Sequence, residues 1–273
     1  YVIRIGSRSA TTLARTLGSL VAQSYPALAV TLVQFHPVEG LDDLIAKVGD
    51  RFRWINHIVV PNNGNRGTSW WAGLNASSAE YIAFVDDDDT LLPNHVDSIM
   101  TVFNRKPEVG FVYTGLIRIQ DEHGHYFSQP NFNGPLNEVI EERRELFACS
   151  MEDFDDFSPR RNFIGHNAWI SRRSLLTEEV LRDPRVEYAE DVLFMILMAG
   201  LTPFAFTGMA TAEWHWRSTT RDNWSLSYPA QRLEEFYARW QERTRAVRLP
   251  IRNRIAPPSG VYVAAEWNTR DPT

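Results

Sequence analysis

Four consecutive aspartates, Asp86, Asp87, Asp88 and Asp89, have the clearest chemical potential in this sequence. They directly follow residues 81–85, an apolar run with the length and composition of a buried strand. Neighbouring carboxylates repel one another, and a bound cation relieves that repulsion. Carboxylate oxygens suit Mg²⁺ or Mn²⁺, and Mg²⁺ usually completes its coordination with water and substrate phosphates. The quartet therefore predicts a divalent metal, Mn²⁺ or Mg²⁺, beside a phosphate-bearing ligand; the alternative is a solvated turn that caps the next helix.

The first ninety residues predict the elements that position this quartet. Strand-like apolar runs alternate with apolar residues at helical spacing. Such β-α-β units form a parallel sheet with right-handed crossovers. Ligands of open parallel sheets bind beyond the carboxyl ends of the strands, which is where the quartet falls. The expected strands are residues 2–5, 28–35, 55–60 and 81–85, the expected helices are residues 13–21 and 41–48, and a polar loop is expected at residues 61–69.

The second half of the chain has a less regular pattern. Residues 190–200 are almost entirely apolar after Glu190 and Asp191, so we expect a buried helix whose acidic start lies at a surface or a cleft. Acids at the start of a helix are also ordinary caps. The other elements expected here are a hairpin formed by residues 111–120 and the chain from residue 126 onward, a charged helix at 136–148, a strand at 212–217 and a closing helix at 231–247.

Composition and charge narrow the class of protein. With 273 residues, 44% of them hydrophobic, the chain is expected to fold, and its net charge of −6 predicts no nucleic-acid partner. A single cysteine, Cys149, is typical of a reducing compartment, and no apolar run reaches the ~18 residues of a membrane span. The expected location is cytoplasmic, compatible with a peripheral position at the inner face of a membrane. Because the sequence opens with Tyr1 in a strand-like run, other domains of a longer parent protein are also expected.

The segment from Gly73 to Pro93, which contains the quartet, resembles the donor-site segment of family 2 inverting glycosyltransferases with its D-x-D-D-x-x-x-P pattern. The opening of the chain is similar as well. Its first strand leads to Ser7 and Arg8, and the next helix ends in the run SLVAQSYP at residues 19–26. The resemblance extends over most of the chain, from about residue 2 to residue 227.

Two downstream features resemble the same family. Glu190 and Asp191 are similar to its E-D pair, whose Asp serves as the catalytic base. His215, in the run from Trp214 to Arg217, falls where related enzymes supply a late histidine to the metal. The alternative for His215 is a packed histidine between two tryptophans.

The resemblance implies an α/β, GT-A-like fold in a single domain, with a Rossmann-type, mostly parallel sheet flanked by helices. It implies a donor-binding half at residues 1–105, an acceptor-binding and catalytic half at residues 106–228, and a C-terminal helix and tail at residues 229–273. The implied activity moves a sugar from a nucleotide-sugar donor to a hydroxyl of a glycan or glycolipid acceptor, with inversion at the anomeric carbon.

The family also implies roles for individual residues. Asp191 is expected to accept the proton of the acceptor hydroxyl, and Glu190 either positions the acceptor or holds Asp191. Asp88 and His215 are the expected ligands of a metal that neutralises the leaving nucleoside diphosphate. Arginine forks match phosphate oxygens well, and Asp86 is expected to face the donor ribose. The complete set of expected donor-binding residues is Arg4, Ser7, Arg8, Arg66, Gly67, Asp86 and Asp87.

The expected acceptor-binding residues are His166 and Trp169, in the second half of the chain. The sequence is 12% aromatic, which favours a carbohydrate or glycolipid acceptor because sugar faces pack on flat rings. The alternative for such aromatic residues is packing in the core. Residues 34–37 lack the acidic pair that many family members carry after the second strand, so the resemblance does not specify the nucleotide base.

Two other functions compete with glycosyl transfer. Residues 81–91 also match the D-x-D-x-T-L motif of haloacid-dehalogenase-type, Mg-dependent phosphatases, with Asp86 as the nucleophile. Those enzymes need a later cation and a further acidic pair, but no Lys follows Lys106, and Glu190 and Asp191 begin an apolar helix. The other alternative is a GT-A-like module that binds a nucleotide or glycan without turnover, against which the retention of mutually repelling acids argues.

Overall fold

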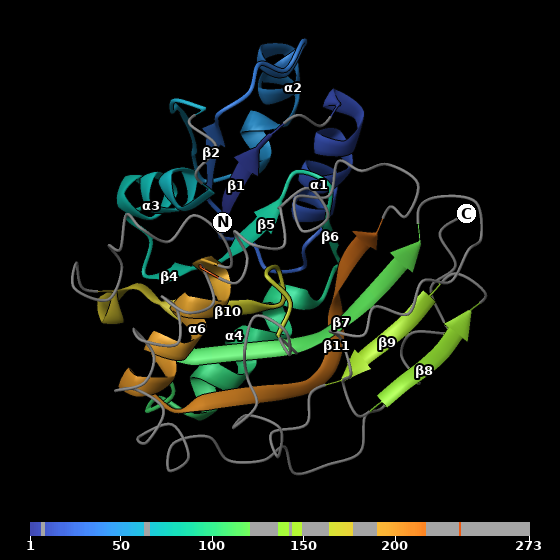
Figure 1. The fold of residues 1–273 in the computed structure, drawn as a ribbon, viewed down its shortest axis with the longest axis vertical. Coiled ribbons are helices and arrows are strands. Elements are labelled where there is room, and N and C mark those ends of the chain that lie inside the picture. The colour runs from blue at the N-terminus through green and yellow to red at the C-terminus, as the bar shows by residue number, and fades with distance from the viewer. Residues whose placement is uncertain are drawn as a thin grey trace.

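The computed structural model describes residues 1–6, 9–62, 66–120, 136–141, 144–148, 164–176 and 190–216, together with residue 235. Its N-terminal part is the parallel sheet that the alternating pattern predicts (Figure 1), and the α/β class is confirmed. Four strands lie in the order β3, β2, β1, β5, and every pairing between them is parallel. The strands are β1 (Val2–Ile5), β2 (Val30–Gln34), β3 (Ile55–Val59) and β5 (Phe84–Asp86).

Helices cover both faces of this parallel sheet. The cluster formed with α1 (Ala10–Val21) and α2 (Leu41–Val48) contains Ile3, whereas the cluster formed with α3 (Arg66–Ala76) contains Val2. Successive side chains of a strand point to opposite faces. The alternation in β1 therefore places Arg4, two residues after Val2, on the face that α3 covers.

The strand expected at residues 81–85 is divided between two sheets. Its first part, β4 (Tyr81–Ile82), pairs with a second sheet, while β5 remains in the first. The second, seven-stranded sheet has the order β4, β10, β7, β11, β6, with β9 on β7 and β8 on β9, and only its β7–β11 pairing is parallel. Its other strands are β6 (Thr90–Leu91), β7 (Phe111–Gln120), β8 (Leu136–Glu141), β9 (Arg144–Ala148), β10 (Trp169–Arg172) and β11 (Phe204–Trp216).

Two local predictions differ from the structure. Residues 136–148, expected as a charged helix, form β8 and β9, because β9 completes the hydrogen bonding of β7 and tertiary pairing overrides local propensity. The loop expected at residues 61–69 is shorter, since α3 begins at Arg66. The returning strand expected just after residue 126 and nearly all of the closing helix at 231–247 lie outside the described residues.

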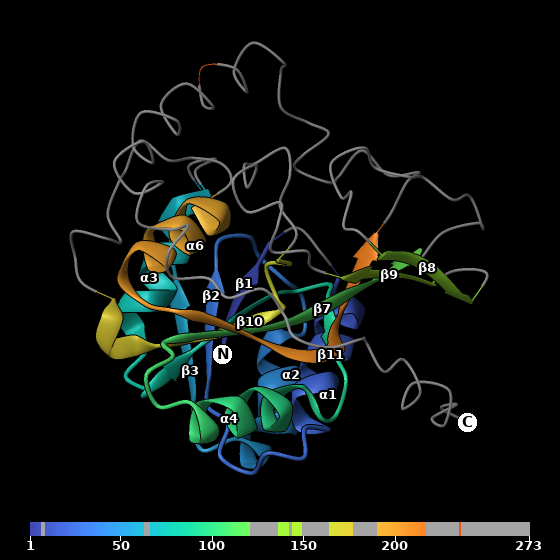
Figure 2. The ribbon, with the colours of Figure 1, turned by 90° about the horizontal axis from the view of Figure 1, so that it is seen from below.

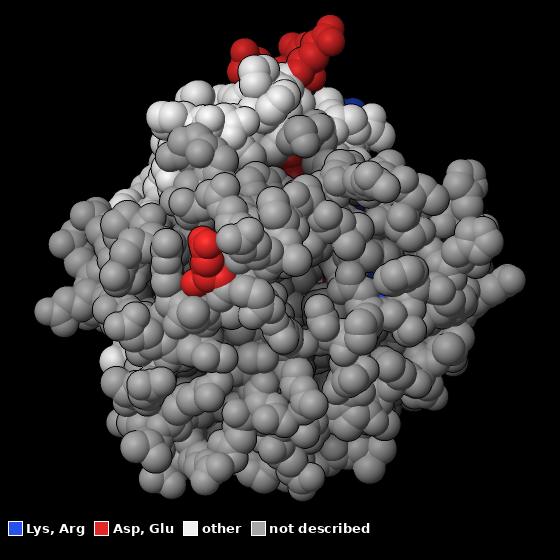
Figure 3. Space-filling view, in the orientation of Figure 1, with Lys and Arg blue, Asp and Glu red and all other residues white. Residues whose placement is uncertain are grey.

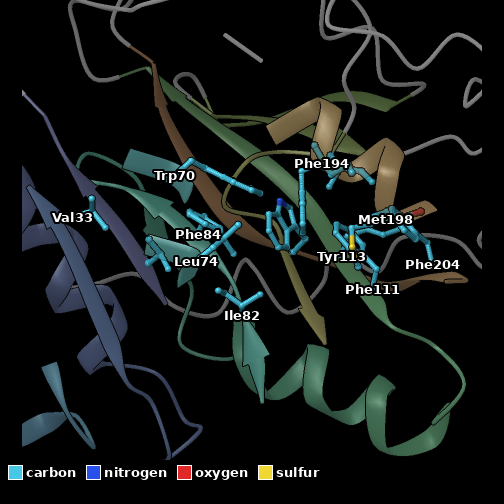
Figure 4. Packing of buried hydrophobic residues seen from close by; sticks show 14 residues of the cluster. Val33, Trp70, Leu74, Ile82, Phe84, Phe111, Tyr113, Phe194, Met198 and Phe204 are labelled. Carbon is cyan, nitrogen blue, oxygen red and sulfur yellow. The ribbon is translucent and has the colours of Figure 1, made fainter. Parts of the chain in front are cut away.

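The second sheet is packed between α6 (Glu190–Leu201) and α4 (His95–Arg105), which lie on opposite faces of it (Figure 2). The predicted apolar helix at residues 190–200 is therefore confirmed as α6. On the face of the second sheet that α6 covers, an aromatic core joins the two sheets (Figure 4). Trp70 of α3 stacks on Phe84 of β5 in this core, with ring centroids 4.4 Å apart. This core fixes the start of α6 close to the carboxyl ends of β1 and β5. No helix among the described residues is long and apolar enough to span a membrane.

Candidate active site

The centre of the candidate site is a buried ion pair between two neighbouring strands. Arg4 of β1 and Asp86 of β5 are register partners, so their side chains emerge side by side on the face covered by α3. Arg4 Nε and Nη2 donate to Asp86 Oδ1 at 3.0 and 2.7 Å. The Arg4 side chain is only 3% exposed, whereas that of Asp86 is 27% exposed. The first aspartate of the quartet is therefore fixed by an ion pair with a cation buried inside the fold.

Glu190 brings the start of α6 into the same network. Its carboxylate is 1% exposed, and Oε1 accepts from Arg4 Nη1 and, at 3.3 Å, from Arg66 Nε. Arg66 Nη2 also lies 3.5 Å from Asp86 Oδ2. Two guanidinium groups thus alternate with two carboxylates where β1, β5, α3 and α6 meet. Glu190 is therefore placed to anchor the start of α6, and its carboxylate is engaged by the two arginines.

The charges of this network stabilise one another. Burial alone would raise the pKa of Asp86, but Arg4, His166 and Arg66 outweigh it and hold that pKa well below its usual value. The pKa of Glu190 is likewise lowered, because Arg66 and Arg4 outweigh the effect of burial. Burial opposes the charge of Arg66, yet Glu190 and Asp86 raise its pKa above the usual value. Both carboxylates are therefore ionised at neutral pH.

His166 links this network to Asp191, the predicted base. His166 lies in a turn in which the Ala168 N–H donates to the Gly165 carbonyl at 3.0 Å. Its Nε2 lies 3.3 Å from Arg4 Nη2 and 3.7 Å from Asp86 Oδ1, and its Nδ1 lies 3.7 Å from Asp191 Oδ2. One imidazole thus spans from the Asp86 carboxylate at the end of β5 to the first turn of α6.

The other members of the quartet are oriented by the elements around them. Asp87 is buried, and its Oδ2 accepts the N–H of Gly6 at 2.8 Å, so it fixes the end of β1. The carbonyl of half-buried Asp88 accepts from Arg15 Nη2 of α1 at 2.9 Å. The four aspartates therefore have different environments, and Asp87 acts on the protein backbone at a position expected to bind the donor.

His215 lies at the end of β11, next to the quartet. Its main-chain N–H donates to Asp89 Oδ1 at 3.0 Å. Thr90 Oγ1 donates to Glu213 Oε2 at 2.6 Å and lies 2.8 Å from His215 Nε2. Because the hydroxyl gives its one hydrogen to the carboxylate, its oxygen accepts from His215 Nε2–H. This chain of hydrogen bonds leaves the lone pair on His215 Nδ1, the form that a metal ligand requires.

The donor set around the quartet fits a divalent cation that draws most of its ligands from elsewhere. Among the described residues, no three or more His, Cys, Asp and Glu side chains gather as a metal site. Mg²⁺ is commonly held by one or two carboxylates, with water and substrate phosphates filling its other positions. Asp88 offers a carboxylate and His215 an imidazole, and the main chain of His215 is hydrogen-bonded to Asp89, the residue after Asp88. These residues suit a divalent ion whose remaining coordination positions are filled by a diphosphate and water.

The remaining expected site residues fall in different places. Gly67 is buried in the first turn of α3, beside Arg66. Ser7 and Arg8 lie outside the described residues. Trp169, expected at the acceptor, is fully buried in the aromatic core, with its ring stacked on Phe111 at 5.1 Å between centroids. Its ring therefore contacts no acceptor in this fold, and the physical reason is that it fills the space between β10 and α6.

Within the part of the chain that the structure describes, one end of the molecule carries exposed acidic side chains. Figure 3 shows acidic side chains projecting at the end of the molecule that carries α2, whose first turn holds the exposed Asp42 and Asp43. Two of the arginines expected to bind the donor lie among the described residues. Of these, Arg66 is the more exposed, with a side chain 25% exposed against 3% for Arg4.

The sequence did not indicate the residues that orient the expected site residues through hydrogen bonds. Thr90 and Glu213 orient His215, and Asn167 Nδ2 donates to the Glu213 carbonyl at 2.9 Å. Thr90 belongs to β6, a strand of two residues, which is too short for any periodic signal. The only available signal was that Thr90 directly follows the quartet.

The chain is similar to proteins of known class. The family model described as Glycosyl transferase family 2 matches residues 7–177, more than half of the chain. An uncharacterized glycosyltransferase of Nostoc sp. is 25% identical over 123 residues, which cover 45% of this chain and 38% of that protein. The glucosyl-dolichyl phosphate glucuronosyltransferase of Haloferax volcanii is 28% identical over 96 residues, which cover 34% and 29%. The chain thus matches about a third of the length of these relatives.

Solved structures of S. aureus TarS share the fold. TarS 1–349 in complex with UDP-GlcNAc has a TM-score of 0.62 at 17% identity, covering 93% of this chain and 66% of that chain. TarS 1–349 in complex with UDP has a TM-score of 0.56 at 15% identity, covering 90% and 71%. The GT-A-like α/β fold expected from the sequence is therefore confirmed.

Proposed function

The chain belongs to glycosyl transferase family 2, and on that premise we propose that it moves a sugar from a nucleotide-sugar donor to a hydroxyl of a glycan or glycolipid, inverting the anomeric centre. One observation carries the proposal: His166 lies 3.7 Å from Asp86 and 3.7 Å from Asp191. A carboxylate at the donor edge and a carboxylate at the start of α6 therefore flank one small region. A single-displacement transfer needs a leaving-group site and a base arranged in this way.

Asp191 is the proposed general base. Its side chain is 19% exposed, so it can reach a bound hydroxyl, whereas Glu190 is buried under Arg4 and Arg66. As the acceptor oxygen attacks the anomeric carbon, its proton passes to Asp191. The bond between that carbon and the diphosphate oxygen breaks, and the nucleoside diphosphate leaves with the electron pair. Attack from the side opposite the leaving group inverts the centre.

The donor edge supplies charge for the diphosphate. Arg66 is the partly exposed arginine beside Asp86, and a guanidinium fork matches phosphate oxygens. A bound Mn²⁺ or Mg²⁺, with Asp88 and His215 as its protein ligands, would neutralise the charge that develops on the departing diphosphate. The TarS complexes with UDP-GlcNAc and UDP support a nucleotide-sugar donor. The glucuronosyltransferase, whose name specifies a glucosyl-dolichyl phosphate, supports a glycolipid among the acceptors.

The competing functions have less support. Asp86, the nucleophile of a phosphatase, has Oδ1 engaged by two hydrogen bonds from Arg4, and family membership points to glycosyl transfer. A binding module without turnover would share the fold and its nucleotide affinity. Only a turnover measurement separates that module from an enzyme.

The experiment compares the natural chain with Asp191→Asn across a panel of nucleotide sugars, with Mn²⁺ or Mg²⁺ present. We expect metal-dependent release of nucleoside diphosphate by the natural chain and a decrease of about 10²–10⁴-fold in the variant. Both proteins should keep donor-induced thermal stabilisation. Asp97→Asn, the same change at an exposed position of α4, is the control and should leave turnover intact. Equal, negligible turnover in all three proteins would identify a binding module.

A further inference from the structure

His166 has no part in the reaction as derived above, yet it is tightly held at the centre of the site. Its turn closes between Ala168 and Gly165, and its side chain is 11% exposed. Its ring centroid lies 5.6 Å from that of Phe84 in β5. A histidine fixed in this way presents its two nitrogens to defined partners.

The partners of the ring determine which nitrogen carries the proton. Arg4 can only donate, so His166 Nε2, 3.3 Å from Arg4 Nη2, accepts. A neutral imidazole that accepts at Nε2 carries its hydrogen on Nδ1. Within the described residues His166 Nδ1 is buried without a hydrogen-bond partner. A carboxylate oxygen that could accept its hydrogen, Asp191 Oδ2, lies 3.7 Å away.

We propose that His166 is a positioning residue that donates Nδ1–H to Asp191 Oδ2 and so presents the other carboxylate oxygen to the acceptor hydroxyl. This inference rests on the proposed function, in which Asp191 is the base. The present separation of 3.7 Å is longer than a hydrogen bond, and catalytic contacts often tighten only when substrate binds. Orientation of a base by a third group is a general requirement of such sites.

Burial, more than the charges around it, keeps His166 neutral. Arg4 of β1, Asp86 of β5, Glu190 and Asp191 of α6 and Arg66 of α3 surround the ring. Burial, followed by Arg4, lowers the pKa of His166 to about 4, although Asp86 and Glu190 act in the opposite direction. At neutral pH the ring therefore contributes a directed N–H donor and no charge. A donor to the ionised carboxylate favours that ionised form over the protonated one.

Three substitutions separate hydrogen bonding from packing. In His166→Asn the amide NH₂ falls near the position of Nδ1, in His166→Gln it falls near that of Nε2, and His166→Phe keeps a ring without a donor. We expect kcat to fall on the order of 10–100-fold in the Gln and Phe variants, as for other residues that orient a reacting group, and to be largely retained in the Asn variant. Donor KM should change little in all three.

The dependence of kcat on pH gives a second readout, which a loss of packing alone would not change. Without the Nδ1–H donor, Asp191 binds a proton more readily, so the acid limb of kcat should move to higher pH in the Gln and Phe variants and stay in place in the Asn variant. A ring needed only for packing would instead make Phe the best replacement. Equal kcat in the natural chain and all three variants would overturn the role of His166 and leave the proposed function intact.

A second measurement needs neither a variant nor turnover. ¹⁵N-histidine NMR of the natural chain should show His166 neutral at pH 6, with its proton on Nδ1. A proton on Nε2, or a doubly protonated ring at that pH, would overturn the inference even if transfer is observed. If the natural chain turned over no nucleotide sugar in the panel, the proposed function itself would fail, which the NMR result alone would not signal.

Discussion

Arg4 and Asp86 lie side by side in the parallel pairing of β1 with β5, and Arg4 gives two N–H groups, Nε at 3.0 Å and Nη2 at 2.7 Å, to the single oxygen Asp86 Oδ1. A third nitrogen of Arg4, Nη1, donates to Glu190 at the start of α6. One buried guanidinium therefore joins the edge of the first sheet that is proposed to bind the donor to the helix that carries the proposed base. The geometry of the site and the stability of the fold depend on the same side chain.

Arg4→Met should destabilise the protein strongly. Removing the cation leaves Asp86 and Glu190 with Arg66, whose side chain is 25% exposed, as their guanidinium partner. Breaking a buried pair costs about 3–5 kcal/mol. The measurement is the free energy of unfolding from urea titration. Arg105→Met, the same change at an exposed position of α4, is the control and should shift it by no more than about 0.5 kcal/mol. Similar values for both variants would mean that Arg4 is dispensable for stability.

The free energy of unfolding should fall as the pH decreases from about 6.5, because buried histidines titrate only after unfolding. His95 is fully buried, with Nδ1 2.8 Å from Thr211 Oγ1, and burial lowers its pKa to about 3. Between about pH 6.5 and about pH 3, the unfolded state binds a proton on His95 that the folded state does not. The free energy of unfolding therefore decreases on acidification. His166 adds to the effect down to about pH 4.

His95→Asn tests this prediction, because the amide can replace Nδ1 toward Thr211 but does not titrate. Its free energy of unfolding should depend less on pH in that window, by up to about 1.4 kcal/mol per pH unit. Urea titrations at several pH values between 4 and 7, the range set by the shifted pKa values, supply the slopes. Parallel slopes for the variant and the natural chain would exclude His95 as a source. Below about pH 4 the lowered pKa values of Asp86 and Glu190 should add a further loss in both proteins.

Thr90→Val should weaken metal binding without touching either proposed ligand. Thr90 Oγ1 fixes the tautomer of His215 and is itself fixed by Glu213. Loss of a group that orients a ligand typically costs about 10–100-fold in metal affinity. Titration with Mn²⁺, followed by electron paramagnetic resonance in the presence of the nucleoside diphosphate of the active donor, measures it. Thr90→Ser keeps the hydroxyl and should bind like the natural chain; if Ser and Val bind equally, the hydrogen-bond chain has no role.

Gly73→Ala should destabilise the packing of α3 on the first sheet. A Cβ at this position would lie 2.2 Å from Val2 Cγ1 and 3.1 Å from Val33 Cγ2, and such overpacking costs about 1–3 kcal/mol. The matched control is Gly18→Ala on the exposed side of α1, where nothing lies within 4 Å. That change should stabilise by about 0.5–1 kcal/mol. Thermal unfolding of the two variants should therefore shift in opposite directions.

Regular patterns in the sequence predicted the parts of the fold that local chemistry dictates. The alternation of apolar strands and amphipathic helices led to β1, β2 and β3 and to α1 and α2, and the apolar run after Glu190 led to α6. Prediction was wrong at residues 136–148, where β9 lies along β7. Strand pairing of this kind joins segments that are far apart in the chain, so periodicity within one segment does not reveal it.

The candidate site divides in the same way. The sequence alone determined which chemical groups are available: the aspartate quartet, the pair Glu190 and Asp191, and a late histidine. The tertiary structure decided what each group does, by placing Arg4 behind Asp86, Glu190 under two arginines, and Trp169 in the core. The physical reason is that charge, burial and hydrogen bonding depend on neighbours in space, and here partners such as Arg4 and Glu190 stand 186 positions apart in the chain.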